Sequence, residues 1–469
     1  MKLSGEKMKS VALKKTQFVF TLLLSFILIL PAVPSLAQSE KEPLTLAKAV
    51  ELALDSNQLV KAARYSVEAA DARMKGVSSN YWPKLNYDYS ISRGNNPVFV
   101  FGSLLTQNRF TLDDFYLPRL NKPDPINNFQ SKFSGSMMLF DFFRTRKGVE
   151  LHKLGKDGSQ KELEKTQADL VFRVLKAYQD ALLAQEFLKV AEEAVKSAEA
   201  DQARVEALFQ AGLVVESDLL SVKVHKASQA EELIKARNNV KMAYSNLNFE
   251  MGFPLDKPYE LAGPLKPFSP EPMDLPSCQK IALERRPDYL QAELGAKSGE
   301  VAVQASKTDF WPMVSAFGQW ETDQSKINSS AGNNYVYGIN VHYNLFNGRA
   351  DQVRLAESRV QQQRAAAMRD YMAQAVRMQV QQAYLDLDSA GGRILVSEQA
   401  VAQAEESLRI IRNRYEAGLT TITDLLRAEV ASIGAKSNRL RAIFDQRVSA
   451  ANLELQTGQL SRSSRILTE

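Results

Sequence analysis

The chain of 469 residues contains one short phrase twice. Phe209-Gln-Ala-Gly-Leu213 returns as Tyr415-Glu-Ala-Gly-Leu419, so that Gly418 lies 206 residues after Gly212. The same offset joins four further pairs of residues: Tyr178 and Tyr384, Asp218 and Asp424, Asn246 and Asn452, and Gly252 and Gly458. A period of this length is too long for a solenoid of stacked repeats, so the chain is predicted to hold one domain-sized unit twice.

The N-terminus has the features of a secretory leader. Five lysines precede an apolar run from Phe18 to Leu30, and Ser35-Leu36-Ala37 then offers the small residues that a signal peptidase reads. The run is shorter than the ~20 residues of a membrane-spanning helix. Residues 1–37 are therefore expected to be removed, which lowers the formal net charge from +5 to about +1. No basic patch with interleaved aromatic residues remains, so a nucleic-acid partner is not expected.

Proline positions divide the mature chain, because a proline inside a helix removes a hydrogen bond. No proline occurs from Ile126 to Phe253 or after Pro312, whereas seven prolines lie between 253 and 276. We therefore expect a first repeat at 38–252, a proline-rich linker at 253–276 and a second repeat at 277–469.

Each repeat carries a long heptad pattern that is typical of packed helices. Apolar and alanine positions alternate in steps of four and three from Leu170 to Phe209, and again from Val376 to Tyr415. Further apolar residues from Val171 to Leu182 suggest a second packing face. The acidic residues scattered along these helices are expected to lie on solvated faces.

The glycine of each tip phrase is expected to end its helix. Gly212 would take the left-handed conformation after a helix at about 147–211, and Leu213 would pack back onto that helix. Ser217 or Asp218 would then begin a returning helix. Gly418 is expected to end the equivalent helix of the second repeat, so each repeat would contain a long antiparallel helical hairpin.

Before each hairpin the apolar residues recur at every second position. This pattern covers 83–92 and 129–139 in the first repeat, the latter with Phe129, Phe133, Met137 and Leu139 on one face. It returns weakly at 313–321 and strongly at 335–345. Period two over about ten residues predicts membrane β-strands with apolar residues toward lipid and polar residues toward a lumen. A soluble sheet packed on one face is the alternative.

Four strands cannot close a barrel, since the smallest barrels have about eight, so the protein is expected to oligomerise around a pore. Trp82 and Trp311 precede the first strand of each repeat, where an interfacial aromatic belt would fall; packing at a helix-to-strand junction is the alternative. The loop between Gly94 and Asn128 is 23 residues longer than its counterpart. It would constrict the mouth of a pore, meet a surface partner, or be a tolerated insertion, and these alternatives stay open.

The order of the predicted elements resembles that of the TolC-like outer-membrane channel family. A leader is followed by a short helix beginning near Leu44, two strands and a long hairpin with an Ala-Gly-Leu tip, and then by a second copy of all but the leader. The resemblance covers essentially the whole mature chain. It implies an α+β membrane protein, a homotrimer whose helical hairpins form an α-barrel across the periplasm. Four strands per protomer would form a 12-stranded transmembrane β-barrel.

The same resemblance implies location in the outer membrane of a Gram-negative-type cell, with a long periplasmic portion. The protein would be the exit duct of a tripartite efflux pump or a type I secretion system. Its partners would be further copies of itself, a periplasmic adaptor (membrane fusion) protein, an inner-membrane pump and outer-membrane lipid.

In this family the periplasmic end closes through contacts from a tyrosine and an arginine of the second tip to a Ser/Thr-Asp pair of the first. The resemblance places the tyrosine on Tyr415 and the pair on Ser217 and Asp218. Thr420 occupies the position of the arginine. The charge-assisted hydrogen bond of that arginine is therefore not available here.

Asp424 matches an acidic residue that forms a ring at the entrance of the trimer, whereas Arg427 replaces the second acid of that ring. Such an entrance would be less selective for cations. Capping alone is the alternative role for Ser217 with Asp218 and for Thr421 with Asp424. The resemblance further implies that adaptor proteins dock at the two hairpin tips, on Gly212, Leu213, Gly418 and Leu419.

Two other classes of protein fit the sequence less well. A soluble periplasmic coiled-coil adaptor would also be exported, but it should show one hairpin instead of two hairpins with four strands. An enzyme is not expected, because the three histidines have no metal-site spacing and the chain has neither a phosphate-binding loop nor a nucleophile motif. No metal or cofactor is therefore expected. Cys278, the single cysteine, is expected to be a small buried residue.

Overall fold

The computed structural model of the protein describes residues 43–468, so the predicted leader at 1–37 lies outside the described residues. Contacts divide the chain into two compact units. Of the smaller unit, the described part is Pro43, Leu44 and Pro258–Leu261. Every helix and strand named below belongs to the larger unit, Thr45–Lys257 with Ala262–Glu469.

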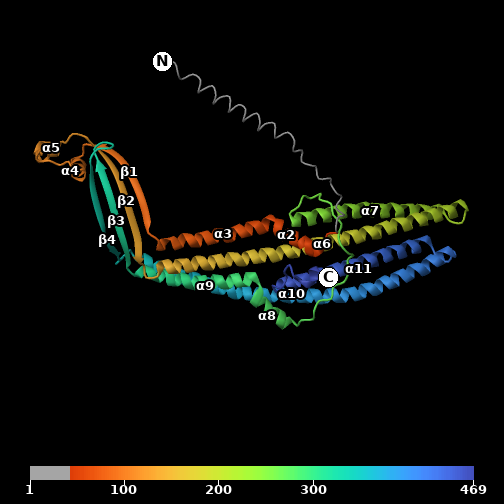
Figure 1. Ribbon diagram of the computed structural model, residues 1–469. Helices are drawn as coiled ribbons and strands as arrows, with labels where there is room; N and C mark the ends of the chain where they lie inside the picture. The colour runs from red at the N-terminus through yellow and green to blue at the C-terminus, as the bar shows by residue number, and fades with distance from the viewer. Residues whose placement is uncertain (1–42, 469) are drawn as a thin grey trace, which may run out of the picture. The chain divides into compact units, whose positions relative to one another are not determined.

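The larger unit repeats one order of elements, which confirms the predicted duplication (Figure 1). The first copy is α2 (Leu46–Ser56), α3 (Gln58–Ser78), β1 (Lys84–Gly94), β2 (Ile126–Phe140), α6 (Arg144–Gln210) and α7 (Glu216–Met251). The second copy is α8 (Leu275–Arg285), α9 (Pro287–Lys307), β3 (Met313–Gln324), β4 (Ala331–His342), α10 (Ala350–Glu416) and α11 (Ile422–Gln456). Two short helices, α4 (Pro97–Thr106) and α5 (Leu117–Asn121), interrupt the first copy between β1 and β2.

The predicted heptad positions form the contacts of the long helices. Positions of the heptad are buried on α6 at Leu170, Val174, Ala177 and Ala181, and on α10 at Val376, Val380, Ala383 and Ala390. Helix α6 packs against α7 and α11, and α10 packs against α11 and α9. Small residues at many of these positions allow the helix axes to approach closely.

The two repeats differ in how much of each long helix is covered. The second packing face of α6, formed by Val171, Leu175, Tyr178 and Leu182, is buried. The positions 206 residues later on α10 are Arg377, Gln381, Tyr384 and Asp388, and all of these except Tyr384 are exposed. Helix α10 therefore leaves uncovered a face that its counterpart buries.

The four strands form one antiparallel sheet in the order β1-β2-β3-β4. Directly paired residues place Tyr87, Phe133, Trp320 and Tyr335 in one row across all four strands. The rings of Tyr87 and Phe133 lie 4.6 Å apart, and those of Phe133 and Trp320 lie 5.8 Å apart. Most large apolar residues of this face are exposed in the protomer, and the opposite face is mainly polar, as the period-two pattern predicts, with Phe317 and Val336 as apolar exceptions.

One strand departs from the strict alternation of its sequence pattern. The register of β2 against β3 shifts between Met138 and Phe140, so that Phe140 pairs with Val314 and Leu139 has no partner on β3. Phe140, paired with Val314, therefore lies on the apolar face, one residue after the position that strict alternation gives to Leu139. A β-bulge adds one residue to a strand, which a strict period of two cannot anticipate.

Equivalent glycines join the returning helices to the short helices of each repeat. Gly252 follows α7 with φ +74°, and an added Cβ there would lie 3.3 Å from Asn57 Cα, at the junction of α2 with α3. Gly458 follows α11 with φ +70°, and its Cβ would lie 2.9 Å from the carbonyl carbon of Arg285, at the junction of α8 with α9. The 206-residue offset between Gly252 and Gly458 thus reflects one contact that each repeat makes, between the end of the returning helix and the junction of the two short helices.

Gly458→Ala is expected to lower the free energy of unfolding by about 3 kcal/mol, since alanine must adopt a left-handed φ and also displace backbone atoms. Gly418→Ala is the matched control, because Gly418 has φ +72° but its Cβ would meet open space. The control should cost only about 1 kcal/mol. Chemical unfolding of the two detergent-solubilised variants measures the difference. Equal losses of unfolding free energy would contradict a role for the close backbone contact at Gly458.

Candidate functional site

Both hairpin tips end their long helices in the same way. Gly212 and Gly418 have φ values of +74° and +72°. Leu213 N donates to Leu208 O at 2.8 Å and Gly212 N to Phe209 O at 2.9 Å, which is the Schellman motif, and the second tip repeats this pattern. The predicted helix ends are therefore confirmed.

The leucines of the tips do not pack as predicted. Leu213 is 71% exposed and Leu419 is 67% exposed, so neither covers its own helix. Each tip instead presents one apolar side chain directly beside a glycine that has nothing within 4 Å of its Cβ position. Two equivalent, exposed and sterically open leucines are the main surface feature of this end of the helices.

The helices that return from the tips begin differently. Helix α7 begins at Glu216 with Val215 as its N-cap and has no side-chain capping bond, so the capping role considered for Ser217 and Asp218 is wrong. Both residues lie inside the first turn, where the Asp218 carboxylate faces the positive end of the helix dipole. The prediction that the helix begins at Ser217 or Asp218 misses its start by one or two residues.

Helix α11 has the capping box that the sequence predicts. Thr421 Oγ1 accepts from Asp424 N at 3.2 Å, and Asp424 Oδ2 accepts from Thr421 N at 3.3 Å. Thr420 and Thr421 also donate their hydroxyls to Asp424 Oδ2, at 2.9 and 2.7 Å. The Thr421 and Thr420 hydroxyl bonds lower the pKa of the Asp424 carboxyl, so this group holds its negative charge at the second tip.

Tyr415 lies where the two tips meet. Its ring packs against the cluster formed by Val205, Leu219, Val222, Ile422 and Leu425. Its hydroxyl is buried and has no hydrogen-bond partner among the described residues. Burial, followed by the charges of Asp218 and Asp201, raises the pKa of Tyr415. The structure thus brings Tyr415 and Asp218 close together without a hydrogen bond, while an ion pair of Arg204 with Glu416 at 2.6 Å joins the hairpins nearby.

A buried group of charged residues lies next to this junction, and it was not among the predicted site residues. Asp201 of α6 is 4% exposed and Glu429 of α11 is 3% exposed, so the expectation that the helix acids lie on solvated faces is wrong for both. Arg412 Nη2 donates to Glu429 Oε1 at 2.7 Å, and Ser197 Oγ donates to the same oxygen at 3.0 Å. His225 Nε2 lies 3.5 Å from Glu429 Oε2. All four long helices therefore contribute to this group.

The two buried carboxyl groups act as one acid. Burial, together with the neighbouring Glu429 carboxylate, raises the pKa of Asp201 to about 7. Burial would also raise the pKa of Glu429, but hydrogen bonds from His225, Asp201, Ser197 and Arg412 outweigh it and hold this pKa low. When Asp201 is protonated, its carboxyl group is placed to donate a hydrogen bond to the ionised Glu429 and so to join the first hairpin to the second.

The tryptophans predicted to lie in an interfacial belt are both exposed at one end of the sheet. Trp82 directly follows the turn after α3, and Trp311 directly follows the turn after α9. The Trp311 ring stacks on Phe142 with centroids 4.8 Å apart. Phe140 and Phe143 lie beside Phe142, so a group of aromatic side chains marks the junction of sheet and helices.

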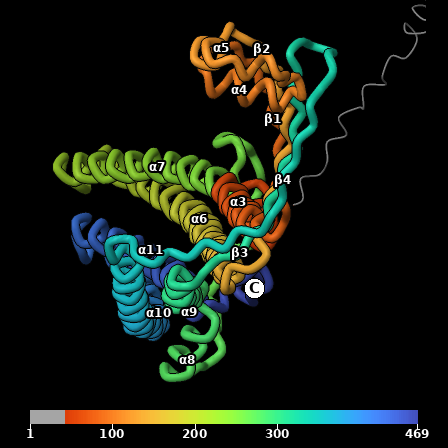
Figure 2. Tube along the Cα trace, turned by 90° about the vertical axis from the view of Figure 1, so that its left-hand side faces the viewer, coloured from red at the N-terminus to blue at the C-terminus, as the bar shows by residue number. Residues whose placement is uncertain are grey.

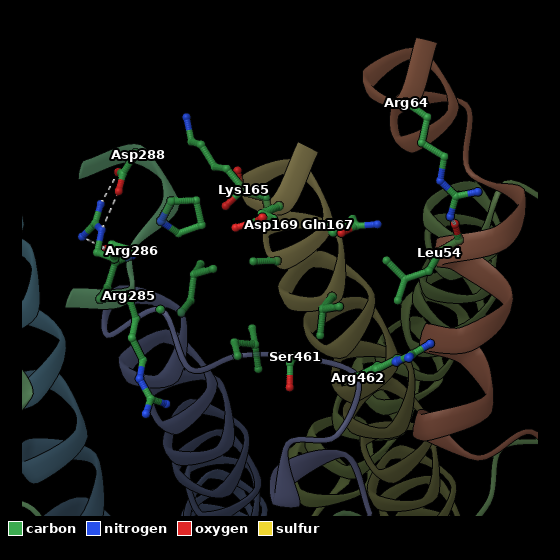
Figure 3. A pocket seen from close by; sticks show the side chains of 18 of the residues that line it. Leu54, Arg64, Lys165, Gln167, Asp169, Arg285, Arg286, Asp288, Ser461 and Arg462 are labelled. Carbon is green, nitrogen blue, oxygen red and sulfur yellow. Dashed lines mark hydrogen bonds and ion pairs between the residues drawn. The ribbon is translucent and has the colours of Figure 1, made fainter. Parts of the chain in front are cut away.

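A cavity of about 580 Å³ lies between the short helices, the middle of α6 and the end of α11. Figure 3 shows Arg286 turned toward Asp288, to which it donates at 2.9 and 2.6 Å. Arg286 also donates to Gln456 at 2.8 Å. These hydrogen bonds connect the junction of α8 and α9 to the end of α11 and are structural. The residues that line the cavity include no nucleophile and base arranged for catalysis.

Within residues 43–468, no helix is long and apolar enough to cross a membrane. The same residues contain no group of three or more His, Cys, Asp or Glu side chains that could hold a metal ion. Cys278 is buried, as predicted for a small apolar residue, and burial raises the pKa of its thiol.

Comparison with known proteins places the chain among outer-membrane proteins. A family model described as outer membrane efflux protein matches residues 49–252 and 279–459. Alkaline protease secretion protein AprF of Pseudomonas aeruginosa is 24% identical over 425 residues, which cover 88% of this chain and 84% of that protein. Outer membrane efflux protein BepC of Brucella suis biovar 1 is 21% identical over 425 residues, covering 89% and 86%.

A solved structure supports the same fold. The outer membrane channel CmeC of Campylobacter jejuni aligns with a TM-score of 0.75 at 18% sequence identity. The alignment covers 90% of this chain and 87% of that chain. At this level of identity the likeness concerns the fold alone, including both hairpins and the four-stranded sheet.

Proposed function

Since the chain belongs to the outer membrane efflux protein family, we propose that three copies of it close one continuous duct. The protein is an exit channel in the outer membrane of Gram-negative bacteria, of the kind that serves efflux or type I secretion. The alternative of a soluble periplasmic adaptor is set aside, because the family model covers both hairpins and the strands. We propose the division into repeats at 38–252 and 277–469, joined by the linker at 253–276.

The proposal of a closed ring rests on the two unpaired edges of the sheet. Strands β1 and β4 are the outer strands, and each pairs with only one neighbour in the described chain. In lipid, every unpaired backbone group costs several kcal/mol, so a membrane sheet must close on itself. Pairing of β4 with β1 of the next copy closes a ring, and three copies supply twelve strands.

The helices have matching free edges. An exposed apolar stripe runs along α7, here called the α7 stripe: Leu220, Val224, Ile234, Met242 and Phe249. A second runs along an exposed side of α10, here called the α10 stripe: Val353, Val360, Tyr371, Met378 and Leu385. Both follow helical spacing and are too long to remain in water without a partner. In a ring the α7 stripe of one copy packs against the α10 stripe of the next.

The tips support the docking of a periplasmic adaptor that connects to an inner-membrane pump. Leu213 and Leu419 are exposed beside Gly212 and Gly418, so an apolar partner helix can approach both tips closely. Trp82 and Trp311 fit the interfacial belt, since aromatic residues gather at membrane–water boundaries. The name of AprF, a protease secretion protein, favours polypeptide cargo for that relative, and we propose the same class of cargo for this chain.

We propose that Ser217, Asp218, Tyr415 and Asp424 form the gate at the periplasmic entrance. In the closed duct the Tyr415 hydroxyl, which is buried close to the charge of Asp218, donates its hydrogen bond to that carboxylate. Asp424, fixed by its capping box, keeps negative charge at the entrance. Thr420 bonds to Asp424, so it holds this carboxylate in place instead of replacing the charge of an arginine.

Release of a trapped hydrophilic dye from liposomes that contain the purified mature protein tests the channel and the gate together. Wild-type protein should release the dye slowly, and Tyr415→Phe and Asp218→Ala should release it several times faster, because each removes one side of the closing hydrogen bond. Tyr384→Phe, at the equivalent of Tyr178 and far from the tips, is the control and should behave as wild type. Variants that release dye at the wild-type rate would overturn the gate but keep the channel.

A further inference from the structure

The long loop between β1 and β2 is a folded element, here called the mouth insert and comprising residues 95–125. It contains α4, a short 3₁₀ turn at Leu112–Phe115, and α5. Asn96 caps α4, and Thr111 with Asp114 forms a capping box. The Phe110 ring contacts Phe101 and Phe115 edge to face, with centroids 4.9 and 5.0 Å away. The insert thus has local caps and a small aromatic core of its own.

The mouth insert lies at the end of the sheet that is opposite to α3 and α9 (Figure 2). It leaves β1 at Gly94 and enters β2 at Ile126, and these two residues are paired partners. Nevertheless α4 contacts β3 and β4, the strands beyond β2. A segment that begins and ends at β1 and β2 can reach β3 and β4 only by crossing a face of the sheet.

The side chains of α4 show that this crossing is a packed contact. Val100, Ser103 and Gln107 are buried at helical spacing on one side of the insert. The Thr106 carbonyl lies over Gly332 of β4, where an added Cβ would be 1.8 Å from the oxygen. Asn334 Nδ2 donates to the same carbonyl at 3.3 Å. Only glycine at 332 allows the end of α4 to lie this close to the strand.

A buried polar chain fixes the insert to the strands. Gln107, 2% exposed, donates through Nε2 to Asn127 O and Asn128 Oδ1, both at 2.9 Å. Asn128 Nδ2 donates to Asp323 Oδ1 of β3 at 2.6 Å. Arg109 Nη1 donates to Gln107 Oε1 at 3.0 Å, which satisfies the remaining atom of that amide. Buried hydrogen-bonded networks of this kind favour one defined conformation, and here only Asp323 Oδ2 of the carboxylate has no partner among the described residues.

The register identifies which face of the sheet the insert covers. Asn128 lies five positions before Phe133, and Asp323 lies three positions after Trp320, so both point away from the aromatic row. Asn334 directly precedes Tyr335 and also lies on the polar face. The polar face of a membrane barrel lines its lumen. The mouth insert is therefore attached to the lumenal face.

We propose that the mouth insert folds into the lumen and is the constriction that limits the size of what leaves the duct at its outer mouth. The inference rests on the proposed function, and it resolves the three alternatives for this loop in favour of constriction. Three copies of the insert would narrow one pore. Leu112, Tyr116 and Leu117 are strongly exposed on its surface and would form the apolar lining past which an extended polypeptide moves.

The test is single-channel conductance in planar bilayers, with neutral polymers of increasing size to measure the exclusion limit. Residues 95–125 are replaced by Asn-Gly, a two-residue turn that suits the paired ends Gly94 and Ile126. The conductance should rise roughly two-fold or more, and larger polymers should enter from the outer side, because a constriction in series limits flow. An unchanged conductance and exclusion limit would overturn the inference.

A second variant keeps the insert and releases its attachment. Gln107→Ala with Asn128→Ala removes the buried chain of hydrogen bonds, and it should raise the conductance and add fluctuations. Asn333→Ala is the matched control, since Asn333 is exposed on the opposite face of β4 and should leave the conductance unchanged. A wild-type protein that does not conduct would refute the proposed function itself. A conducting wild type that both variants match would refute only the lumenal constriction.

Discussion

Met378→Glu combined with Leu385→Glu is expected to abolish assembly of the protein while leaving its protomer folded. Both side chains belong to the α10 stripe, and Met378 is 68% and Leu385 52% exposed in the protomer, so the change removes little packing within it. In the ring, each interface would lose about 1.5–3 kcal/mol of apolar burial per side chain and would bury two carboxylates. A closed ring of three contains this interface three times, so the penalty is repeated.

Light scattering of the detergent-solubilised protein after size-exclusion chromatography measures this effect. The wild type should have the mass of three chains and the double variant the mass of one. Gln379→Glu is the control for charge, since it adds one negative charge, where the double variant adds two, at an exposed position of α10 outside the stripe and should remain trimeric. A double variant that assembles like the wild type would show that the α10 stripe is not an interface.

Raising the pH from 5 to 8 is expected to loosen the junction of α6 with α11. The pKa of Asp201, about 7, lies above its ordinary value of 3.8, so the folded state retains a proton that the unfolded chain loses. The stabilisation is complete below about pH 4 and is lost as the pH rises through 7. It amounts to about 4 kcal/mol at most, since one pKa unit corresponds to about 1.4 kcal/mol. The lowered pKa of Glu429 reflects the same shared proton and is not added.

Hydrogen exchange of residues 195–205 and 425–432, corrected for the intrinsic effect of pH, reports this loosening. Asp201→Asn should keep the donated hydrogen bond at every pH and remove the dependence. His225→Gln separates out the neighbouring imidazole, and the charges of Arg412 and Arg204 also act on Asp201. Asp218→Asn, at the half-buried tip position, is the control and should retain the wild-type response. An Asp201→Asn protein that still loosens between pH 5 and 8 would contradict the carboxyl pair.

The sequence predicts the fold well where periodicity is the dominant physical signal. The 206-residue offset gives both repeats, and the heptad and period-two patterns give the four long helices and the four strands close to their observed bounds. The glycines at 212 and 418 end their helices because only a residue without Cβ adopts the left-handed conformation freely. Each of these features is local in sequence and needs no knowledge of a distant partner.

Features that depend on distant partners are predicted poorly. Leu213 and Leu419 follow the expected motif but are exposed, because the tip has no adjacent surface to cover them. The β-bulge at Leu139 depends on the register of β2 against β3. The fold of the mouth insert depends on Asp323, which lies almost 200 residues after Asn128. The sequence indicates the extra length of this loop but not the face that it covers.

Helical spacing from buried neighbours is the signal that could have identified the buried carboxyl pair, although Asp201 itself lies one position before the heptad position at 202. Asp201 follows Ala198 by three positions and precedes Val205 by four, and all three are buried on α6. Glu429 similarly lies four positions after Leu425 on α11. An acidic residue at helical spacing from buried apolar residues predicts a buried charge, which needs a partner from another helix. The identity of that partner still required the structure.

Single-channel recording from the purified mature wild-type protein in planar bilayers tests the central claim most directly, because a duct closed by three copies must behave as one pore. We expect discrete current steps of a single size that appear only with the trimeric fraction and are absent from the Met378→Glu, Leu385→Glu protein. Protein shown to be folded and trimeric that gives no steps would contradict the account, and so would a monomeric fraction that conducts in the same way.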